Sequence, residues 1–430
     1  MGASTLATGE AAWIMFGIFF ALLALRVPVA ISLGLACLPA FIIEDRLWPM
    51  ILVQETFNSY NSFILLAVPF FLLAANLMTA GGITDRLVKL SRSMVGHLPG
   101  GLAQINVVLS VFFAGISGSS TADAASQGKI FIEAQIKEGY APSFSVAITA
   151  VSSVLAVVIP PSILMIVWGG VLTTSIGALF LALAQMGTVH VYSKARGYPT
   201  YPKATWGELG YALFISIPAL MTPFIIIGGK IFGWFTPTEA ACVAVLYALA
   251  LSGLVYRKLD WRGLYACFSE TGRFAAITLF CVGTASAFGW LMAFYQIPQS
   301  VLAGVSAWEM GPIAAGFFIA AVFLIVGCFL DAIPAIIIVG TILQPVAAAA
   351  GIHPVHFAMI SITSLAFGLV TPPYGLCLLI CCSIANLRLV DVLKDVILML
   401  LPMLAVLVLL ILWPGMALLI PSWLEPEFMH

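Results

Sequence analysis

Two polar segments interrupt an otherwise apolar chain and carry the side chains that could bind small ions. They are Gly115-Ile-Ser-Gly-Ser-Ser-Thr-Ala-Asp123 and Gly327-Cys-Phe-Leu-Asp-Ala-Ile-Pro334. Hydroxyl, carbonyl and carboxylate oxygens are the ligands that hard cations such as sodium prefer. Because a carboxylate within a bilayer is costly and by default marks a functional site, Asp331 is the strongest candidate in a chain this apolar.

Both segments belong to a glycine and proline pattern that repeats at an offset of 212 residues. Its first copy, Gly115, Gly128, Gly139, Pro142, Ser152, Pro160 and Pro161, recurs as Gly327, Gly340, Gly351, Pro354, Ser364, Pro372 and Pro373. Chance rarely preserves backbone-breaking residues so selectively, so the chain consists of two related halves. Paired, interrupted apolar segments in corresponding places point to the substrate site of a transporter.

The composition predicts an all-α polytopic membrane protein. Hydrophobic residues make up 62% of the chain and charged residues 8%, and the mean hydropathy is +1.13. Apolar stretches near 13–34, 61–80, 143–192, 209–230, 237–256, 274–294, 312–348, 355–385 and 395–420 approach or exceed the roughly 20 residues that cross a bilayer. The strict alternation of a barrel strand is absent, so helices remain. A net charge of -1 with 17 Lys plus Arg leaves no basic face for nucleic acid.

The positive charges predict opposite orientations for the two halves. Lys and Arg gather in short clusters, whereas no Lys or Arg lies between Phe274 and Leu387. The clusters are Arg86, Lys89 and Arg92; Lys194, Arg196 and Lys203; Arg257, Lys258 and Arg262; and Arg388 and Lys394. Basic loops stay on the cytoplasmic side. The basic stretch 86–97 corresponds at the offset to Pro298–Glu309, which has no basic residue. We therefore expect an inverted-topology repeat.

Each half is predicted to contain a re-entrant helical hairpin. In the first half, Gly115 and Gly118 permit a tight turn, and Ser120 followed by Asp123 fits a capping box that restarts a helix. We accordingly assign Asp123 to helix capping. The corresponding tip at 327–334 lacks the hydroxyls and has gained a carboxylate, so the two sites are not identical.

Each half is also predicted to contain a broken helix at its double proline. Proline lacks an N–H donor and so leaves carbonyls one turn earlier without a partner. The carbonyls predicted to be free are those of Ala156, Val157, Gly368 and Leu369. A hairpin tip facing a broken helix in each half suggests two cation sites. The N-termini of the half-helices carry partial positive charge and could hold an anion between them without a buried Lys or Arg.

The cysteines and histidines indicate no metal centre of the zinc type. The eight cysteines lie in apolar stretches without a Cys-x-x-Cys pair and are expected to be free thiols. We expect His353 to begin a helix rather than bind a metal. Thr236-Pro-Thr-Glu239 has the cap, proline and glutamate of a helix start.

The motifs together resemble the large membrane (M) subunit, DctM-like, of the tripartite ATP-independent periplasmic (TRAP) transporters. The matching segments are Gly115–Ala124, Ile159–Ser162, Phe235–Ala241, Leu330–Ala335 and Gly368–Gly375. The resemblance implies an elevator-type importer in the bacterial inner membrane, driven by about two or more sodium ions and without an organic cofactor or enzymatic activity. It also implies two partners, a small four-helix membrane subunit (Q) and a periplasmic substrate-binding protein (P). The implied solute is a small organic anion of the carboxylate or sulfonate class.

The residue patterns and the resemblance together give two sets of candidate site residues. For the substrate they are Ser117, Ser162, Asp331, Pro161 and Pro373. For sodium they are Ser117, Gly118, Ser119, Val157, Ile159, Cys328, Asp331, Gly368, Val370 and Thr371.

We expect the chain to divide into scaffold and transport segments. These are 1–99, scaffold helices and the arm of the first repeat; 100–192, the first hairpin and broken helix; 193–310, a cytoplasmic loop, scaffold helices and the second arm; 311–390, the second hairpin and broken helix; and 391–430, a C-terminal helix.

Two other functions remain possible from the sequence. A sodium symporter for divalent anions would share the architecture and work without a binding protein. A rhomboid-like intramembrane serine protease would use the Gly-x-Ser-Gly sequence that ends at Gly118, but it needs a general base beside Ser117 and gives no reason for a duplicated double proline.

Overall fold

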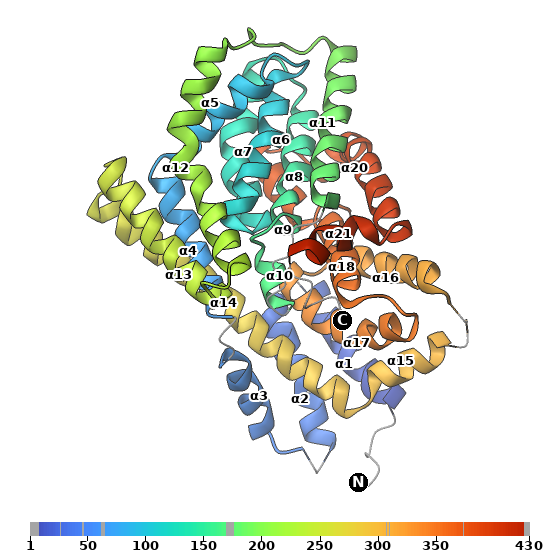
Figure 1. The fold of residues 1–430 in the computed structure, drawn as a ribbon. Helices are drawn as coiled ribbons and strands as arrows, with labels where there is room; N and C mark the ends of the chain where they lie inside the picture. Colours follow the sequence, from blue (N-terminus) through green and yellow to red (C-terminus); the bar gives the residue numbers. More distant parts are fainter. Residues whose placement is uncertain are drawn as a thin grey trace.

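The computed structural model describes residues 8–25, 27–44, 47–61, 65–168, 176–306, 308, 310–372 and 374–424. Every regular element among them is a helix (Figure 1). In chain order these are α1 (Thr8–Ala24), α2 (Val29–Ile43), α3 (Met50–Tyr60), α4 (Ala67–Ala80), α5 (Ile83–Val95), α6 (Gly101–Ser117), α7 (Ser120–Lys137), α8 (Pro142–Ser153), α9 (Leu155–Val158), α10 (Ile163–Val167), α11 (Ile176–Arg196), α12 (Trp206–Ile231), α13 (Pro237–Leu249), the π-helix η1 (Ala250–Val255), α14 (Trp261–Phe294), α15 (Ile297–Ser306), α16 (Pro312–Gly327), α17 (Ala332–Ala349), α18 (Pro354–Gly368), α19 (Leu376–Ala385), α20 (Leu389–Leu412) and α21 (Gly415–Leu424).

Several helices are long and apolar enough to cross a membrane. Within the described residues there are six, or up to seven if α4 and α5, bent by 74° at their junction, count as one span. The protein is therefore an all-helical, multi-span membrane protein, as its composition predicts. The apolar stretch 13–34 proved to hold parts of two helices, because Pro28 immediately precedes α2 and cannot continue α1.

The duplication seen in the sequence governs the helix boundaries. Shifted by 212 residues, α7 would span 332–349, which are the bounds of α17. The same shift carries α5 to 295–307, near α15, and α11 to 388–408, near α20. Figure 1 shows α5 in the upper part of the molecule and α15 in the lower part. The repeat thus extends from the arm helix through the hairpin and broken helix to the helix that follows.

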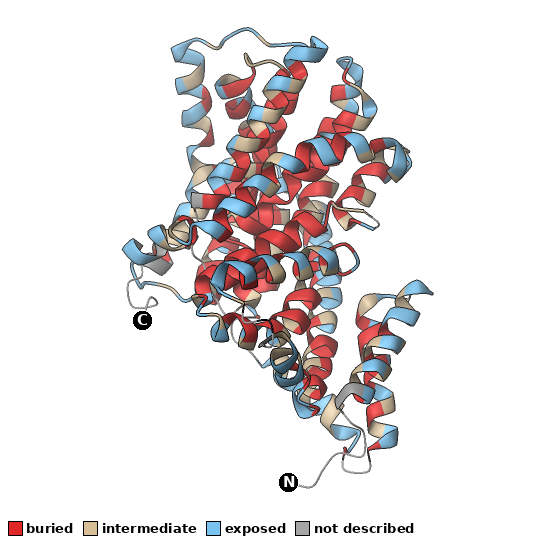
Figure 2. Ribbon diagram, turned by 90° about the vertical axis from the view of Figure 1, so that its right-hand side faces the viewer, coloured by how far each residue is buried: buried red, intermediate tan, exposed pale blue. Residues whose placement is uncertain are grey.

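Four helices form two helical hairpins, and we call α6–α7 hairpin 1 and α16–α17 hairpin 2. Hairpin 1 and α8 belong to the most deeply buried part of the molecule, where buried residues fill the central helices (Figure 2). The outer helices mix buried and exposed positions instead, as expected where side chains contact lipid or a partner.

One repeated glycine pair lets each hairpin contact the other repeat. A Cβ atom on Gly128 of α7 would lie 2.6 Å from Ile384 Cδ1 of α19, and one on Gly340 of α17 would lie 3.1 Å from the Trp168 ring at the end of α10. The second arm of each hairpin thus packs on the second half of the broken helix of the opposite repeat. This close packing between the two repeats explains why glycine occurs at both positions.

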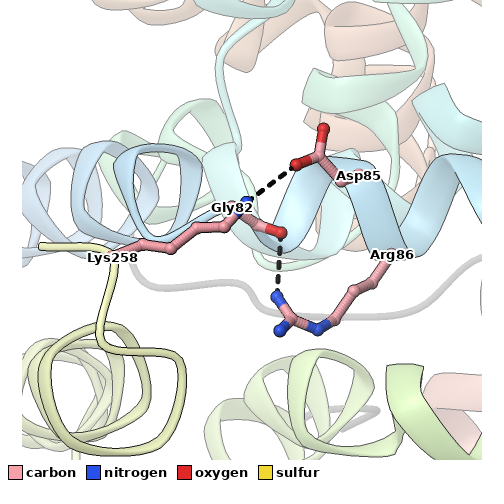
Figure 3. Close-up of polar contacts among 4 residues, drawn as sticks. All are labelled: Gly82, Asp85, Arg86 and Lys258. Atoms are coloured by element: carbon pink, nitrogen blue, oxygen red, sulfur yellow. Dashed lines mark hydrogen bonds and ion pairs between the residues drawn. The ribbon is translucent and has the colours of Figure 1, made fainter.

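A bent junction joins α4 to α5. Gly82 has a φ of 75°, the left-handed region that favours glycine. Figure 3 shows Arg86 donating to the Gly82 carbonyl at 3.0 Å and Lys258 paired with Asp85 at 3.1 Å. The Ser252 hydroxyl also donates to Leu77 O at 2.9 Å. These contacts fasten the bend to the end of η1.

Tyrosines cover the three basic residues of α5. Arg86 lies 3.4 Å from the Tyr256 ring centroid, Lys89 lies 4.6 Å from that of Tyr211, and Arg92 lies 4.1 Å from that of Tyr201. Such cation–π contacts are worth about 0.5–1 kcal/mol each at exposed sites. Burial and the hydrogen bond to Glu138 raise the pKa of Tyr201 to about 12, so this phenol stays protonated at neutral pH. The arm is therefore held against α12, η1 and the loop before α12.

Replacing Gly368 with alanine should destabilise the protein. The new Cβ atom would lie 2.5 Å from Gly327 Cα, and these backbone atoms of α16 can yield only if the helix moves. Overpacking of this kind costs about 1–3 kcal/mol. In detergent, Gly368→Ala should lower the thermal unfolding midpoint by several degrees. Gly187→Ala on α11, where the added Cβ meets nothing within 4 Å, is the matched control. Equal midpoints for the two variants would contradict this packing.

Candidate functional site

The tip of hairpin 1 is a tight turn at Gly118 and Ser119. Gly118 ends α6 with a φ of 60°, and the Ser119 hydroxyl accepts from the Ala122 N–H at 3.5 Å. The N-cap is thus Ser119 and not Ser120, so the assignment of Asp123 to capping is wrong. Asp123 lies one turn inside α7, where its Oδ1 accepts from the Ser117 hydroxyl at 2.6 Å. Both residues are buried.

This tip is seated against the first broken helix. The break lies at 159–162, between α9 and α10, and the Ile163 N–H donates to the Gly118 carbonyl at 3.2 Å. A Cβ atom on Gly118 would lie 2.6 Å from Pro161 O, so only glycine permits this approach. Ser162 makes no capping bond, and its buried hydroxyl has no partner among the described residues.

The tip of hairpin 2 is seated in the same way against the second broken helix. The Gly375 N–H, just before α19, donates to the Cys328 carbonyl at 3.3 Å. Gly375 corresponds to Ile163, the donor in the first repeat, at the offset of 212. Asp331 begins α17, and its Oδ1 accepts from the Ala332 N–H at 2.8 Å. Unlike Asp123, Asp331 is exposed.

The prediction of free carbonyls needs correction in the second repeat. Gly368 O accepts from the Thr371 N–H and Leu369 O accepts from the Cys377 N–H, each at 3.0 Å. The chain turns back after α18, so these donors reach carbonyls that the prolines would otherwise leave without partners. The Thr371 hydroxyl donates to Phe367 O at 2.7 Å and keeps its lone pairs for another ligand.

In the first repeat, the carbonyls of Ala156 and Val157 are still expected to be free. Ala156 and Val157 stand four residues before Pro160 and Pro161, which have no N–H to offer.

The second half of the second broken helix approaches both tips. Cys377 on α19 lies near both Asp123 and Asp331, and its thiol is hydrogen-bonded to Ser153 of α8. Asp331 also lies near Cys281 of α14. Both acidic residues are therefore near Cys377 of α19, and Asp331 is also near Cys281 of α14.

The candidate residues fall into two groups, one in each repeat. In the first, Ser117, Gly118 and Ser119 form the tip, and Val157, Ile159, Pro161 and Ser162 lie at or beside the break. In the second, Cys328 and Asp331 form the tip, and Gly368, Val370 and Thr371 lie at the break. Pro373 lies outside the described residues.

Sequence reasoning missed the roles of Asp123 and Gly375. The spacing of Asp123 from Ser120 suited a cap, and only the turn at Gly118 reveals that Ser117 faces the carboxylate. Gly375 could have been found from the offset, because it corresponds to the first residue of α10.

Several smaller predictions are confirmed. All eight cysteines are free thiols. His353 begins α18 and its Nδ1 accepts from the Val355 N–H at 3.2 Å, and Thr236 with Glu239 forms a full capping box.

A cavity of about 310 Å³ lies between α10, α17 and the start of α18. Trp168, Thr341, Gln344 and Phe357 are among its lining residues, and the candidate site residues are not. It is therefore separate from the two seated tips.

The Ser117 hydroxyl donates to a carboxylate and not to a histidine ring. The partner of Ser117 is thus not the histidine that pairs with the nucleophile in a Ser–His site.

Comparisons with known proteins agree with this architecture. The chain is 35% identical over 417 residues to SiaM, the large permease protein of a sialic acid TRAP transporter from Vibrio cholerae, with 95% of this chain and 97% of SiaM covered. It is 35% identical over 416 residues to TeaC, the large permease protein of an ectoine TRAP transporter from Halomonas elongata, with 94% and 97% covered.

Among solved structures, the YdaH transporter of Alcanivorax borkumensis shares the fold, with a TM-score of 0.56, 15% identity, and 85% of this chain and 87% of that chain covered. Residues 16–416 match the family described as the DctM component of the tripartite ATP-independent periplasmic transporters. The chain belongs to this family of TRAP transporter large permeases.

Proposed function

We propose that this TRAP large permease couples the entry of sodium to the uptake of a small organic anion by an elevator mechanism. The observation that carries the proposal is the seating of each hairpin tip on a broken helix, once in each repeat. Irregular backbone at membrane depth persists only where protein buries it or water reaches it. We take the two hairpins to be re-entrant and the two repeats to be inserted in opposite orientations.

The first sodium site is assigned to the seated tip of hairpin 1. Its ligands would be the Ser117 hydroxyl, backbone oxygens of 118–119, and carbonyls at Val157 and Ile159 of the broken helix. Asp123 joins this set, because its Oδ1 accepts from Ser117 while its buried Oδ2 has no hydrogen-bond partner among the described residues. A buried carboxylate favours a bound cation, since an uncompensated buried charge is costly.

The second sodium site is assigned to the seated tip of hairpin 2. Asp331 would supply the charge, and the Thr371 hydroxyl and backbone oxygens at Cys328, Gly368 and Val370 would complete the shell. The exposure of Asp331 supports a role shared with the substrate, because a carboxylate that reaches the surface of the tip can meet an arriving solute and its co-ion together.

The substrate is proposed to bind between the two tips, near Ser162, Pro161 and Asp331. The sequence has no Lys or Arg between Phe274 and Leu387, so the second repeat offers an anion no basic side chain there. Helix N-termini at the tips, those of α7 and α17, and the bound sodium ions would supply the positive potential instead. Sialic acid and ectoine, the solutes named for two relatives, suggest a carboxylate, with a sulfonate as the related possibility.

The elevator division assigns 100–192 and 311–390 to the moving part and the helices around α4, α12, α13 and α14 to the scaffold. The bends at the two arm helices would be the joints, and the contacts around Gly82 and Lys258 would anchor the first. A small membrane subunit and a periplasmic binding protein would complete the transporter in the inner membrane. Large apolar side chains exposed on α2 and α3, among them Ile42 and Phe57, suit a membrane partner or lipid.

Uptake should depend on sodium and on an inside-negative potential. Each sodium ion that enters down 100 mV releases about 2.3 kcal/mol, before its concentration gradient is counted. The protein should be reconstituted with its small subunit and binding protein, and uptake of labelled organic acids measured with sodium, potassium or choline outside. Equal uptake in all three salts would refute sodium coupling. Equal uptake without the binding protein would instead favour a stand-alone divalent-anion symporter.

Removing the charge of Asp331 should abolish most uptake. Interactions with a charged group are worth about 1.5–3 kcal/mol, so Asp331→Asn should reduce uptake at least about tenfold while assembly with the small subunit persists. Asp391→Asn, at an exposed ion pair with Arg388, is the control and should transport normally. Wild-type uptake by Asp331→Asn would remove this residue from the site.

Removing the charge of Asp123 should weaken sodium binding and leave the fold intact. An asparagine can still accept the Ser117 hydrogen bond through its amide oxygen, so a purely structural role would survive the change. We expect Asp123→Asn to raise the sodium concentration for half-maximal uptake about tenfold, as the loss of about 1.4 kcal/mol implies. An unchanged sodium dependence would leave Asp123 as a structural residue only.

A further inference from the structure

The interior of hairpin 1 is polar where the interior of hairpin 2 is apolar. Five hairpin 1 residues are at most 1% exposed, namely Gln104, Asn106, Ser110, Gln127 and Gln135. At the offset of 212 they correspond to Gly316, Phe318, Val322, Val339 and Ala347. The two hairpins have nearly the same length and the same seat on a broken helix. The polar side chains of hairpin 1 are therefore not required by this fold.

These side chains continue inward from the Ser117–Asp123 pair as a series of hydrogen-bonded steps. The Ser110 hydroxyl donates to Gln127 Oε1 at 2.7 Å and joins the two arms of the hairpin. Four residues earlier on α6, the Asn106 amide donates to the Thr149 hydroxyl of α8 at 2.7 Å. Residues four apart lie one turn apart on the same helix face, about 5–6 Å from each other. We call this series the polar ladder.

The polar ladder leads toward the basic end of the molecule. Gln104, two residues before Asn106, donates to Met186 O of α11 at 3.0 Å. Just beyond it, the Gly101 N–H donates to Pro199 O at 3.1 Å, in the loop whose Tyr201 stacks on Arg92. Because basic loops mark the cytoplasmic side, the ladder runs from the tip of hairpin 1 to that side.

Each step of the polar ladder retains a polar atom without a partner among the described residues. These atoms are Asp123 Oδ2, Gln127 Nε2, Asn106 Oδ1 and Gln104 Oε1, together with both amide atoms of Gln135 and Gln185. Polar side chains that merely join helices satisfy one another. Here each pair includes one donor or acceptor that has no partner. Groups of this kind in protein interiors bind water, and a buried water molecule typically makes about three hydrogen bonds.

We propose that the polar ladder holds a file of bound water inside hairpin 1, along which the co-transported cation leaves the Ser117–Asp123 site for the cytoplasmic side once the solute has been carried inward. The identity of the cation rests on the proposed sodium coupling. The presence of water rests on the polar atoms without partners. A small monovalent cation needs oxygen ligands along its path, and amide, hydroxyl and water oxygens provide them at intervals of about one helical turn. Hairpin 2, with apolar residues at these positions, offers no such path.

The water is tested first, without transport. Hydroxyl radicals made by X-ray radiolysis of the purified protein in detergent label side chains that touch bound water. Phe131 lies on α7 between Gln127 and Gln135 and is 1% exposed, whereas Phe288 of the scaffold is 0% exposed and packs against Phe16 and Phe19. We expect Phe131 to be labelled several-fold more than Phe288. Equal, low labelling of both would show a dry hairpin and overturn the proposal.

The path is tested by removing both partners of one step. Ser110→Ala with Gln127→Leu makes the step apolar at similar volume, and replacing both partners of a hydrogen bond together can be nearly neutral for stability. The double variant should lose the Phe131 label and show several-fold slower uptake, with its thermal stabilisation by sodium unchanged. Gln299→Leu, the same change at an exposed position on α15, should keep wild-type rates.

The outcomes separate this inference from the proposed function. Uptake at the wild-type rate by the double variant, with the label lost, would show that the water plays no part in release of the cation. If sodium neither stabilises nor drives the wild-type protein, sodium coupling fails, whereas the labelling of Phe131 still decides whether the hairpin holds water. Loss of sodium stabilisation in the double variant would place the defect at the tip and contradict a separate path.

Discussion

The architecture depends on one constraint, which is that each hairpin tip must find a hydrogen-bond partner on a broken helix. Gly118 O receives the N–H of Ile163, and Cys328 O receives that of Gly375. Each bond joins the end of a hairpin helix to the start of a half-helix across a break. In lipid an unsatisfied backbone group costs several kcal/mol, so a tip without its broken helix would not be stable. The two elements therefore occur together, and both occur twice.

Close approach is the second requirement, and it explains which residues repeat. Gly118 lies against Pro161, Gly327 lies against Gly368, and a side chain at any of these glycines would collide with backbone. Gly128 and Gly340 play the same part between repeats. The repeated glycines are thus contact points of the tips and of the exchanged packing, and the repeated prolines mark where the helices break or begin.

Much of this arrangement could be predicted from the sequence, because glycine and proline act locally. The hairpin turn, the helix breaks and the start of α18 at Pro354 follow from backbone rules that hold in any context. The errors concern groups whose partners come from elsewhere in the fold. Asp123 faces Ser117 only because the turn folds α7 back on α6, and Leu369 O is satisfied by Cys377 across the second break. Local patterns do not contain these tertiary partners.

The differences between the repeats carry the functional argument. Symmetry explains the positions at which both copies have the same residue, such as the glycines, because the same close contact requires the same residue in each copy. It cannot explain a buried Ser117–Asp123 pair in one tip and an exposed Asp331 in the other, nor buried amides in one hairpin where the other has apolar residues. Buried polar groups are costly unless something compensates them. Hairpin 2 forms the same fold without buried polar groups at these positions. Their presence in hairpin 1 is therefore best explained by what that hairpin binds.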